Sequence, residues 1–392
     1  MSRDRVDILL PVFNGALTIE AAVDSLRAQT VAELRVIIVD DGSTDETPRL
    51  IAAMARRDKR IVILTKPNGG IVEALNLGLS RCEGTFVARQ DADDVSDPGR
   101  LEAQIDYLAR HQDCVAVSGA VRHVDGAGRS LGTIQRFAAP EGADPHWAPS
   151  REPYLSHPFL MVRRPAIHSL GGYRHVHNSE DTDLYWRLGA CGRLHNLAAP
   201  LGSYRMHQGS ISGGSIVGGR IMALSSQLAG LSALRRRANR ADLSFVKEAV
   251  AEYRAASTLG KIYQLGCRQL DDAEAGYLRI AASGKLLELT AYRPFELECD
   301  DCAFIREARG EMGRLSPANR AELDALYAAS AARLLRKGLG REAALLAPPS
   351  LYASVAGRVA ATMLPGSWSH RIARMRRRER AAPEDAAGDL AL

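Results

Sequence analysis

The first 110 residues alternate between short apolar runs and amphipathic segments, and this alternation restricts the fold more than any other feature. Apolar runs typical of strands lie at residues 6–11, 34–39, 60–65 and 85–89. Segments with helical spacing lie between them, at residues 16–29, 47–57 and 70–79. Alternating strands and helices form a mostly parallel sheet that helices cover on both faces. We therefore expect an α/β fold that binds its ligands beyond the carboxyl ends of the strands.

Polar or glycine-bearing loops follow all four expected strands, at residues 11–14, 40–43, 68–70 and 89–94. The last of these loops holds Asp91, Asp93 and Asp94, and three adjacent carboxylates repel one another unless a cation is bound. Mg²⁺ and Mn²⁺ prefer such oxygen ligands and often bridge protein carboxylates to the phosphates of a substrate. A solvated acidic turn before the helix that begins near Asp97-Pro98 is the alternative for this cluster taken alone.

The chain divides by composition into three parts. Beyond residue 114 the pattern loosens, with strands expected at residues 115–119 and 159–163 and a helix at residues 182–188. From about residue 220 onward the sequence is rich in Ala, Leu and Arg with helical spacing. We predict an α/β domain at residues 1–220, a helical C-terminal region at 221–380 and a disordered tail at 381–392. The helical region is expected to contact the acceptor, a membrane or another protomer.

Five motifs together resemble those of family 2 glycosyltransferases, in both order and spacing. The resemblance covers about residues 5–212, and its motifs are Pro11–Asn14, Val39–Asp45, Asn68–Gly70, Arg89–Asp94 and Glu180–Asp181. It implies the GT-A fold, which is a Rossmann-like, mostly parallel sheet flanked by helices. It also implies an enzyme that uses a nucleoside diphosphate sugar together with Mg²⁺ or Mn²⁺.

The resemblance assigns the donor site to the loops at the strand ends. Asp41 is expected to contact the nucleobase, and the main chain at Val12 is a second nucleotide contact. Asp93 is expected to be the direct metal ligand, with Asp91 near the ribose or the metal, whereas Asp94 caps the following turn. Leu75 stands where many relatives have Arg, so Lys66 or Arg89 would supply that charge. The predicted donor-binding residues are Pro11, Val12, Asn14, Asp41, Asn68, Gly70, Arg89 and Asp91.

The resemblance places the catalytic base nearly ninety residues beyond the metal motif. An inverting transfer needs a base that takes the proton of the acceptor hydroxyl, and Asp181 of the Glu180-Asp181 pair is the candidate. Favourable charge at a helix N-terminus is the structural alternative for this pair. His207 is predicted as a third metal ligand, and His157 and Glu180 are placed on the acceptor side.

The remaining features restrict partners and location. The net charge is only +5, six cysteines are too few for a disulfide scaffold, and the lone Cys299/Cys302 pair does not define a zinc site. We expect no signal peptide, no transmembrane helix and no nucleic-acid partner. The arginines of Arg371–Arg380 suit peripheral contact with an anionic membrane. A cytoplasmic protein, in contact with the inner face of the cytoplasmic membrane through this segment, fits these features.

The function expected from the resemblance is inverting, hexosyltransferase-like transfer from a UDP-sugar to a hydroxyl of a saccharide or glycolipid. Synthesis of bacterial cell-surface polysaccharide fits that expectation by analogy. One alternative is a related nucleotidyltransferase, although residues 14–17 lack the glycine-rich basic loop that such enzymes need. The other is a scaffold that binds a nucleotide sugar without catalysis.

Overall fold

The structure of the protein is a computed structural model that describes residues 5–206 and 214–363. It comprises two compact units, Met1–Phe295 and Glu296–Leu392. Three predicted features lie outside the described residues and stay predictions: the metal ligand His207, the basic segment Arg371–Arg380 and the tail at residues 381–392. Within the described ranges, no helix combines the length and apolar character needed to cross a bilayer.

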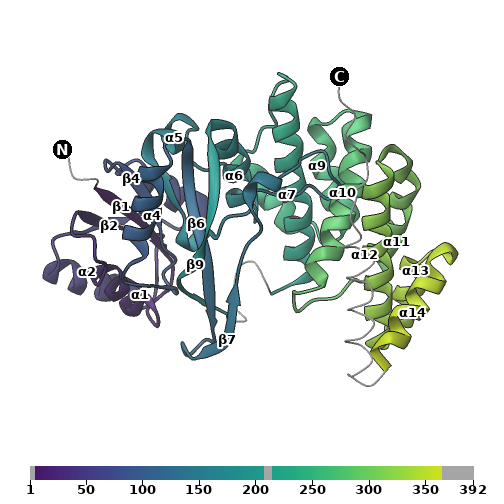
Figure 1. Cartoon of the computed structure of the whole chain (residues 1–392), viewed down its shortest axis with the longest axis horizontal. Helices are drawn as coiled ribbons and strands as arrows, with labels where there is room; N and C mark the ends of the chain where they lie inside the picture. The colour runs from purple at the N-terminus through teal and green to yellow at the C-terminus, as the bar shows by residue number, and fades with distance from the viewer. Residues whose placement is uncertain (1–4, 207–213, 364–392) are drawn as a thin grey trace, which may run out of the picture. The chain divides into compact units, whose positions relative to one another are not determined.

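Four parallel strands form one half of the sheet, in the spatial order β3, β2, β1, β4, of which Figure 1 labels β2, β1 and β4. The end of β1 pairs in register with the end of β2, Val12 opposite Asp40, so the loops that follow begin at the same edge. β1 includes Pro11 and Val12, and the turn begins at Phe13, slightly later than the sequence predicts. The bounds are β1 Val6–Val12, β2 Leu34–Asp40, β3 Ile61–Thr65 and β4 Phe86–Arg89.

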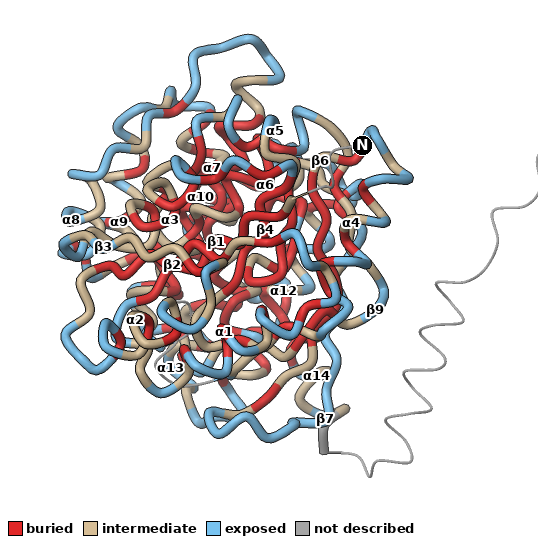
Figure 2. Tube along the Cα trace, turned by 90° about the vertical axis from the view of Figure 1, so that its left-hand side faces the viewer, coloured by how far each residue is buried: buried red, intermediate tan, exposed pale blue. Residues whose placement is uncertain are grey.

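Helices cover both faces of these strands, as the alternation predicts. Successive residues of a strand point to opposite faces. Ile8 and Leu10 therefore pack with α1 and α2, whereas Leu9 packs with α3. Burial on both faces explains why β1, β2 and β4 are buried along almost their whole length (Figure 2). The helices are α1 Ile19–Arg27, α2 Thr47–Arg57 and α3 Ile71–Leu79.

The predicted α/β fold with flanking helices is confirmed, and the other half of the sheet adds antiparallel strands that make the sheet mixed. β8 pairs antiparallel with both β4 and β6, and β6 pairs parallel with β9. β5 and β7 join antiparallel to β9 and β6. The strands are β5 Val95–Ser96, β6 Cys114–Val124, β7 Ser130–Gln135, β8 Met161–Arg163 and β9 Arg193–Arg205. The connecting helices are α4 Arg100–Arg110, η1 Pro140–Gly142, η2 His157–Phe159, α5 Arg164–Ser169 and α6 Glu180–Cys191.

A buried arginine at the start of α4 holds the segment that follows β4. The Arg100 guanidinium is almost fully buried and donates hydrogen bonds to the side chains of Gln90 and Ser96 and to the carbonyl of Arg89. Burial, together with the nearby Arg89, lowers the pKa of Arg100 to about 9. Because buried polar groups must be hydrogen-bonded, this network fixes the path of residues 89–96.

The predicted helical region begins at Ile216 and splits between the two units. The helices of the first unit pack around Leu224, Leu228 and Leu278. They are α7 Ile216–Arg237, α8 Lys247–Ala255, α9 Leu259–Gly266, η3 Cys267–Gln269 and α10 Asp272–Thr290. The change from strands to helices thus comes close to residue 216, but the boundary between the compact units comes at Phe295. The functional division at residue 220 stays a prediction.

The second unit is helical throughout its described residues. The buried Tyr327 hydroxyl donates to the carbonyl of Ile305 and joins α12 to α11. Burial raises the pKa of the Cys302 thiol to about 12, so the thiol stays protonated at neutral pH. The elements are α11 Cys299–Ala308, η4 Arg309–Arg314, α12 Pro317–Arg336, α13 Gly340–Leu346, η5 Pro349–Leu351 and α14 Tyr352–Met363.

Candidate functional site

Hydrogen bonds join the loop after β1 to the loop after β2. The Asn14 side chain accepts from the backbone N–H of Thr44 at 2.8 Å, and the Asn14 N–H donates to the Ser43 hydroxyl at 2.9 Å. Asn14 adopts a left-handed conformation with φ of 51°, which asparagine tolerates better than most residues. Asn14 therefore shapes the rim through its side chain and its backbone together, and it remains exposed to solvent.

Asp41 joins the loop after β2 to the start of α3. Its buried carboxylate accepts from Lys66 Nζ at 2.6 Å and from the backbone N–H groups of Gly69 and Gly70 at 3.0 and 2.8 Å. Gly70 has φ of 88°, which favours glycine at the residue that opens the helix. Lys66 is thus engaged by Asp41 and is not held out toward the rim. The Asn68 side chain is exposed at the same edge.

The loop after β4 brings three carboxylates together. One oxygen from each of Asp91, Asp93 and Asp94 lies within 4.8 Å of the others, a spacing that suits a single divalent cation. Burial and the neighbouring carboxylates raise the pKa of Asp94, and one of its buried oxygens has no hydrogen-bond partner. Such an electrostatic conflict is relieved by a bound cation. The donor set therefore fits Mg²⁺ or Mn²⁺.

The sequence predicts that Asp94 caps the following turn, but the structure shows a different role for its side chain. Its other oxygen accepts from the backbone N–H of Arg205 at the end of β9, at 2.8 Å. The Arg205 guanidinium in turn donates a hydrogen bond to the carbonyl of Asp93, also at 2.8 Å. α4 begins after Gly99, without a side-chain cap. The cluster is therefore held against β9, a strand more than a hundred residues away in the chain.

Arg89 is a buried cation directly behind the cluster. Its guanidinium pairs with Asp91 at 2.5 Å, while its Nε and one terminal nitrogen have no hydrogen-bond partner. Burial acts to lower the pKa of Arg89, but Asp91, Tyr173 and Asp94 outweigh it, so the pKa is raised. Two unused donors in a buried site are suited to an anionic ligand.

Glu180 and Asp181 form the first turn of α6. Burial, followed by the charge of Asp181, raises the pKa of Glu180 to about 8. Burial also raises the pKa of Asp181 to about 6, although the N–H of Thr182 opposes this shift by donating to the carboxylate at 2.7 Å. At neutral pH the two raised pKa values leave the pair holding about one proton, so that one of the two carboxylates is ionised. An ionised carboxylate with a raised pKa is a suitable general base.

Aromatic rings surround the predicted acceptor-side residue His157. Its Nε2 lies 2.9 Å from the hydroxyl of Tyr173, and its ring makes edge contacts with Tyr173 and Tyr185. Tyr154 contacts Tyr185 in turn and is 42% exposed. Burial and the nearby Arg89 hold the pKa of His157 well below its usual value, so the imidazole is neutral. A neutral histidine within a tyrosine wall suits an uncharged, hydroxyl-rich ligand.

Asn76 braces this wall. Its amide exchanges two hydrogen bonds, each of 2.9 Å, with the backbone N–H and C=O of Tyr173. The preceding Gly172 has φ of 77°, and a Cβ there would lie 2.5 Å from the Asn76 side chain. The turn before α6 therefore requires glycine, and Asn76 positions Tyr173 instead of lining the donor site.

The carboxylate cluster and the Glu180-Asp181 pair belong to one site. Both Arg89 and Asp91 influence the pKa of Glu180, and both influence the pKa of Tyr173 together with Asp181. Tyr154, Tyr173 and Tyr185 were missed by the sequence analysis because they carry no motif of their own. His207 lies outside the described residues, so its relation to this site is untested.

The sequence also gives no sign of a charged group, centred on Glu152, that links the site to α7 and α10. The negative charge of Glu152 raises the pKa of Asp181. Glu152 forms an ion pair with Lys285 of α10 at 3.1 Å and accepts a hydrogen bond from Gln227 of α7 at 3.2 Å. α7 and α10 thus fix a charge that acts on Asp181. A lysine in a helix carries no signal for this role, since its partner is over a hundred residues away.

Comparisons with known proteins identify a family that shares this sequence. A model of the family described as Glycosyl transferase family 2 matches residues 7–171. The Bacillus subtilis protein EpsE, named as a glycosyltransferase, is 30% identical over 197 residues, which span 47% of this chain and 67% of EpsE. The Escherichia coli O-antigen biosynthesis glycosyltransferase WbnJ is 29% identical over 211 residues, or 53% of this chain and 82% of WbnJ. Pasteurella multocida chondroitin synthase is 30% identical over 193 residues, 49% of this chain but only 20% of that enzyme.

Proposed function

The chain belongs to glycosyltransferase family 2, and on this premise we propose that it is a metal-dependent, inverting enzyme that transfers a sugar from a UDP-sugar. The observation that carries the proposal is the pair of carboxylate groups near Arg89: Asp91, Asp93 and Asp94, whose spacing suits a cation, and Glu180-Asp181, where burial raises the pKa of Asp181. The acceptor in this proposal is a saccharide or glycolipid of a bacterial cell-surface polysaccharide. WbnJ, named for O-antigen biosynthesis, supports that setting.

The rim loops and the carboxylate cluster bind the donor in this account. Asp93 and Asp91 hold Mg²⁺ or Mn²⁺, which would neutralise the charge that develops on the departing diphosphate. Arg89 has two buried donors available for an anionic group beside this cluster. The carboxylate of Asp41 contacts the nucleobase. It is held in place by hydrogen bonds from Lys66 and from the start of α3. The main chain at Pro11 and Val12, and the side chains of Asn14 and Asn68, complete the rim.

Asp181 accepts the proton of the acceptor hydroxyl as that oxygen attacks the anomeric carbon. Glu180 keeps its proton at neutral pH and so limits the negative charge beside the base. Tyr154 and Tyr173, with His157, form the wall against which a sugar ring can stack. The attack and the departure of the diphosphate take place on opposite sides of the anomeric carbon, so its configuration inverts.

The nucleotide and the metal can be tested before any acceptor is known. We expect UDP to raise the thermal denaturation temperature in the presence of Mn²⁺, because a ligand at 100 times its Kd stabilises a protein by about 2.7 kcal/mol. The shift should be much smaller when EDTA replaces Mn²⁺, and smaller with GDP than with UDP. Equal shifts with and without metal, or a preference for GDP, would contradict the donor proposal.

The pKa of the base predicts how activity depends on pH. Asp181 acts only when ionised, so kcat should rise about tenfold per unit at pH values below about 6 and level off above it. Above about pH 8 the ionisation of Glu180 places a second negative charge beside the base. The measurement is kcat between pH 5 and 9 with saturating donor and Mn²⁺, so that occupancy of the metal site stays constant. A rate independent of pH between 5 and 7 would exclude Asp181 as the base.

A further inference from the structure

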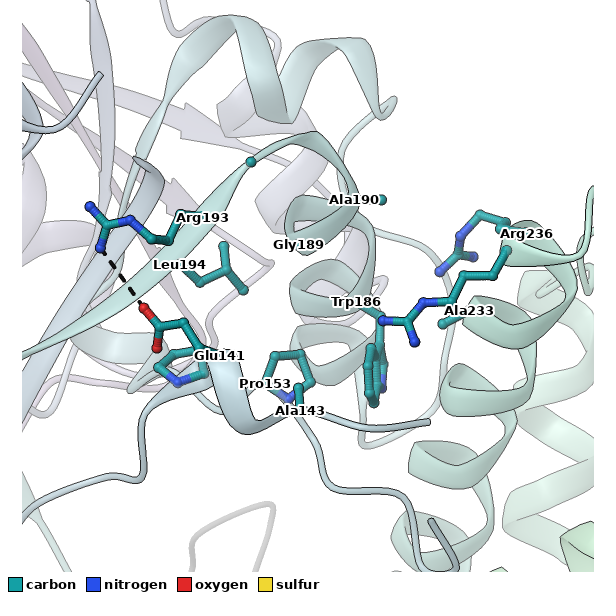
Figure 3. A pocket seen from close by; sticks show the side chains of 13 residues that line it. Glu141, Ala143, Pro153, Trp186, Gly189, Ala190, Arg193, Leu194, Ala233 and Arg236 are labelled. Carbon is teal, nitrogen blue, oxygen red and sulfur yellow. Dashed lines mark ion pairs between the residues drawn. The ribbon is translucent and has the colours of Figure 1, made fainter. Parts of the chain in front are cut away.

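A pocket of about 440 Å³ lies in the first unit between α6, the start of β9, the end of α7 and the loop at residues 140–153. In Figure 3 the indole of Trp186 stands beside Pro153, with Arg193 and Glu141 on one side of the pocket and Arg236 on the other. The volume falls within the range of small-molecule sites, roughly 300–1,000 Å³. None of these residues belongs to the site assigned above.

Small side chains create the hollow, and two of the residues that line it hold buried donors without partners. Gly189, Ala190 and Ala233 line the pocket where larger side chains would fill it. Trp186 is only 5% exposed, yet its indole N–H has no hydrogen-bond partner, and neither does one terminal nitrogen of Arg236. Buried donors without acceptors are costly, so this pocket is built for a ligand that supplies acceptors.

The charge of the pocket is positive. Arg236 donates hydrogen bonds to Ser232 and Asp242. Asp242 is not neutralised by Arg236 alone, because it also forms an ion pair with Arg174 at 2.9 Å. Arg174 and Arg187 both pair with Asp183, so three guanidinium groups share two carboxylates. The adjacent Arg237 lines the pocket and makes no ion pair with any residue that the structure describes. The positive charge in excess is available to an anion.

We propose that this pocket binds the carboxylate-bearing ring of a hexuronate, as a second subsite for an acidic saccharide acceptor; this inference rests on the proposed function. Arginine binds carboxylates through two parallel hydrogen bonds, and the indole N–H can donate to a sugar hydroxyl. Proline rings and an indole suit the apolar faces of a sugar ring. Pro153 lines the pocket, and the next residue, Tyr154, belongs to the aromatic wall beside Asp181. Asp181 and Trp186 both lie on α6, five residues apart.

The indole resonance of Trp186 provides a direct test. The chain has three tryptophans, and the Trp186→Phe variant identifies the relevant indole N–H signal by its disappearance from a ¹H–¹⁵N spectrum. We expect glucuronate to shift this signal in a saturable way, whereas glucose at the same concentration leaves it in place. Arg237→Gln should weaken glucuronate binding roughly tenfold or more. Arg56→Gln removes the same charge from an exposed position on α2 and should leave binding unchanged.

Other outcomes overturn the inference. If glucuronate leaves the Trp186 signal unmoved, or glucose moves it equally, the pocket does not recognise a carboxylated sugar. If UDP moves it at lower concentrations than glucuronate, the pocket is a nucleotide site. The thermal shift with UDP and Mn²⁺ is measured on the same sample. If UDP and Mn²⁺ raise the denaturation temperature but glucuronate does not bind, only the hexuronate proposal is rejected. If glucuronate binds but UDP and Mn²⁺ leave the denaturation temperature unchanged, only the donor proposal is rejected.

Discussion

Replacing Asp181 with asparagine is expected to lower kcat for sugar transfer by about 10²- to 10⁴-fold, with the Kd for the donor within about twofold of the wild-type value. The amide has the shape of the carboxylate but cannot accept a proton, so only the step that needs the base is affected. The Thr182 N–H can still donate to the remaining side-chain oxygen, which keeps the start of α6 in place. Steady-state kinetics and calorimetric titration with UDP-sugar and Mn²⁺ measure the two quantities.

Glu180→Gln is the matched control for this variant. Because burial and Asp181 raise the pKa of Glu180 to about 8, its side chain is already neutral at pH 7, and glutamine imitates that state. We expect this variant to keep kcat within about tenfold of the wild type. If Glu180→Gln loses the activity and Asp181→Asn retains it, the base is Glu180. If Asp181→Asn loses donor affinity as severely as turnover, Asp181 binds the donor.

Replacing Asp93 with alanine is expected to weaken UDP binding in the presence of Mn²⁺ roughly 100-fold, to the affinity seen without metal. Asp93 is one of the three carboxylates whose oxygens lie within 4.8 Å of one another. Without metal, the variant should unfold at the same or a higher temperature than the wild type, since one source of repulsion is removed. Titration of UDP with and without Mn²⁺, alongside thermal denaturation, measures both effects.

Asp24→Ala is the control for the metal variant. It makes the same change at an exposed position on α1, where Arg27 is the one described residue that forms an ion pair with Asp24. A surface pair of this kind contributes little, so donor binding and its metal dependence should match the wild type. Retention of Mn²⁺-dependent binding by Asp93→Ala would rule out Asp93 as a ligand.

The parallel half of the sheet could be predicted because its signal is local. Ile8, Leu9 and Leu10 alternate between two buried faces, and the helices between the strands have their own amphipathic spacing. The positions of Asp41 and of the carboxylate cluster at the sheet edge follow from that alternation. β7, by contrast, is exposed at all six of its residues and has no apolar pattern. β9 pairs parallel with β6, about eighty residues earlier, and such a long-range pairing leaves no trace in its own segment.

The roles of single side chains depended on partners that are distant in sequence. Asp94 resembles a turn cap, but its partner is the backbone of Arg205. Asn76 braces the backbone of Tyr173, nearly a hundred residues later, and nothing near Asn76 in the sequence identifies that partner. The tyrosines around His157 come from separate segments that only the fold brings together. The motif residues themselves lie near Arg89 within one site; they are Asp91, Asp93, Glu180 and Asp181. Their catalytic and metal-binding roles stay predictions.

The most direct test of the account is the configuration of the sugar at the moment of its release. Donor hydrolysis, in which water takes the place of the acceptor, can be followed by ¹H NMR with Mn²⁺ and an α-linked UDP-sugar, without knowledge of the acceptor. If Asp181 deprotonates the attacking oxygen on the face opposite the diphosphate, the β-anomer appears first and the α-anomer only later by mutarotation. Initial release of the α-anomer would contradict the inverting mechanism, and absence of hydrolysis with intact UDP-sugar binding would favour a scaffold that binds the nucleotide sugar without catalysis.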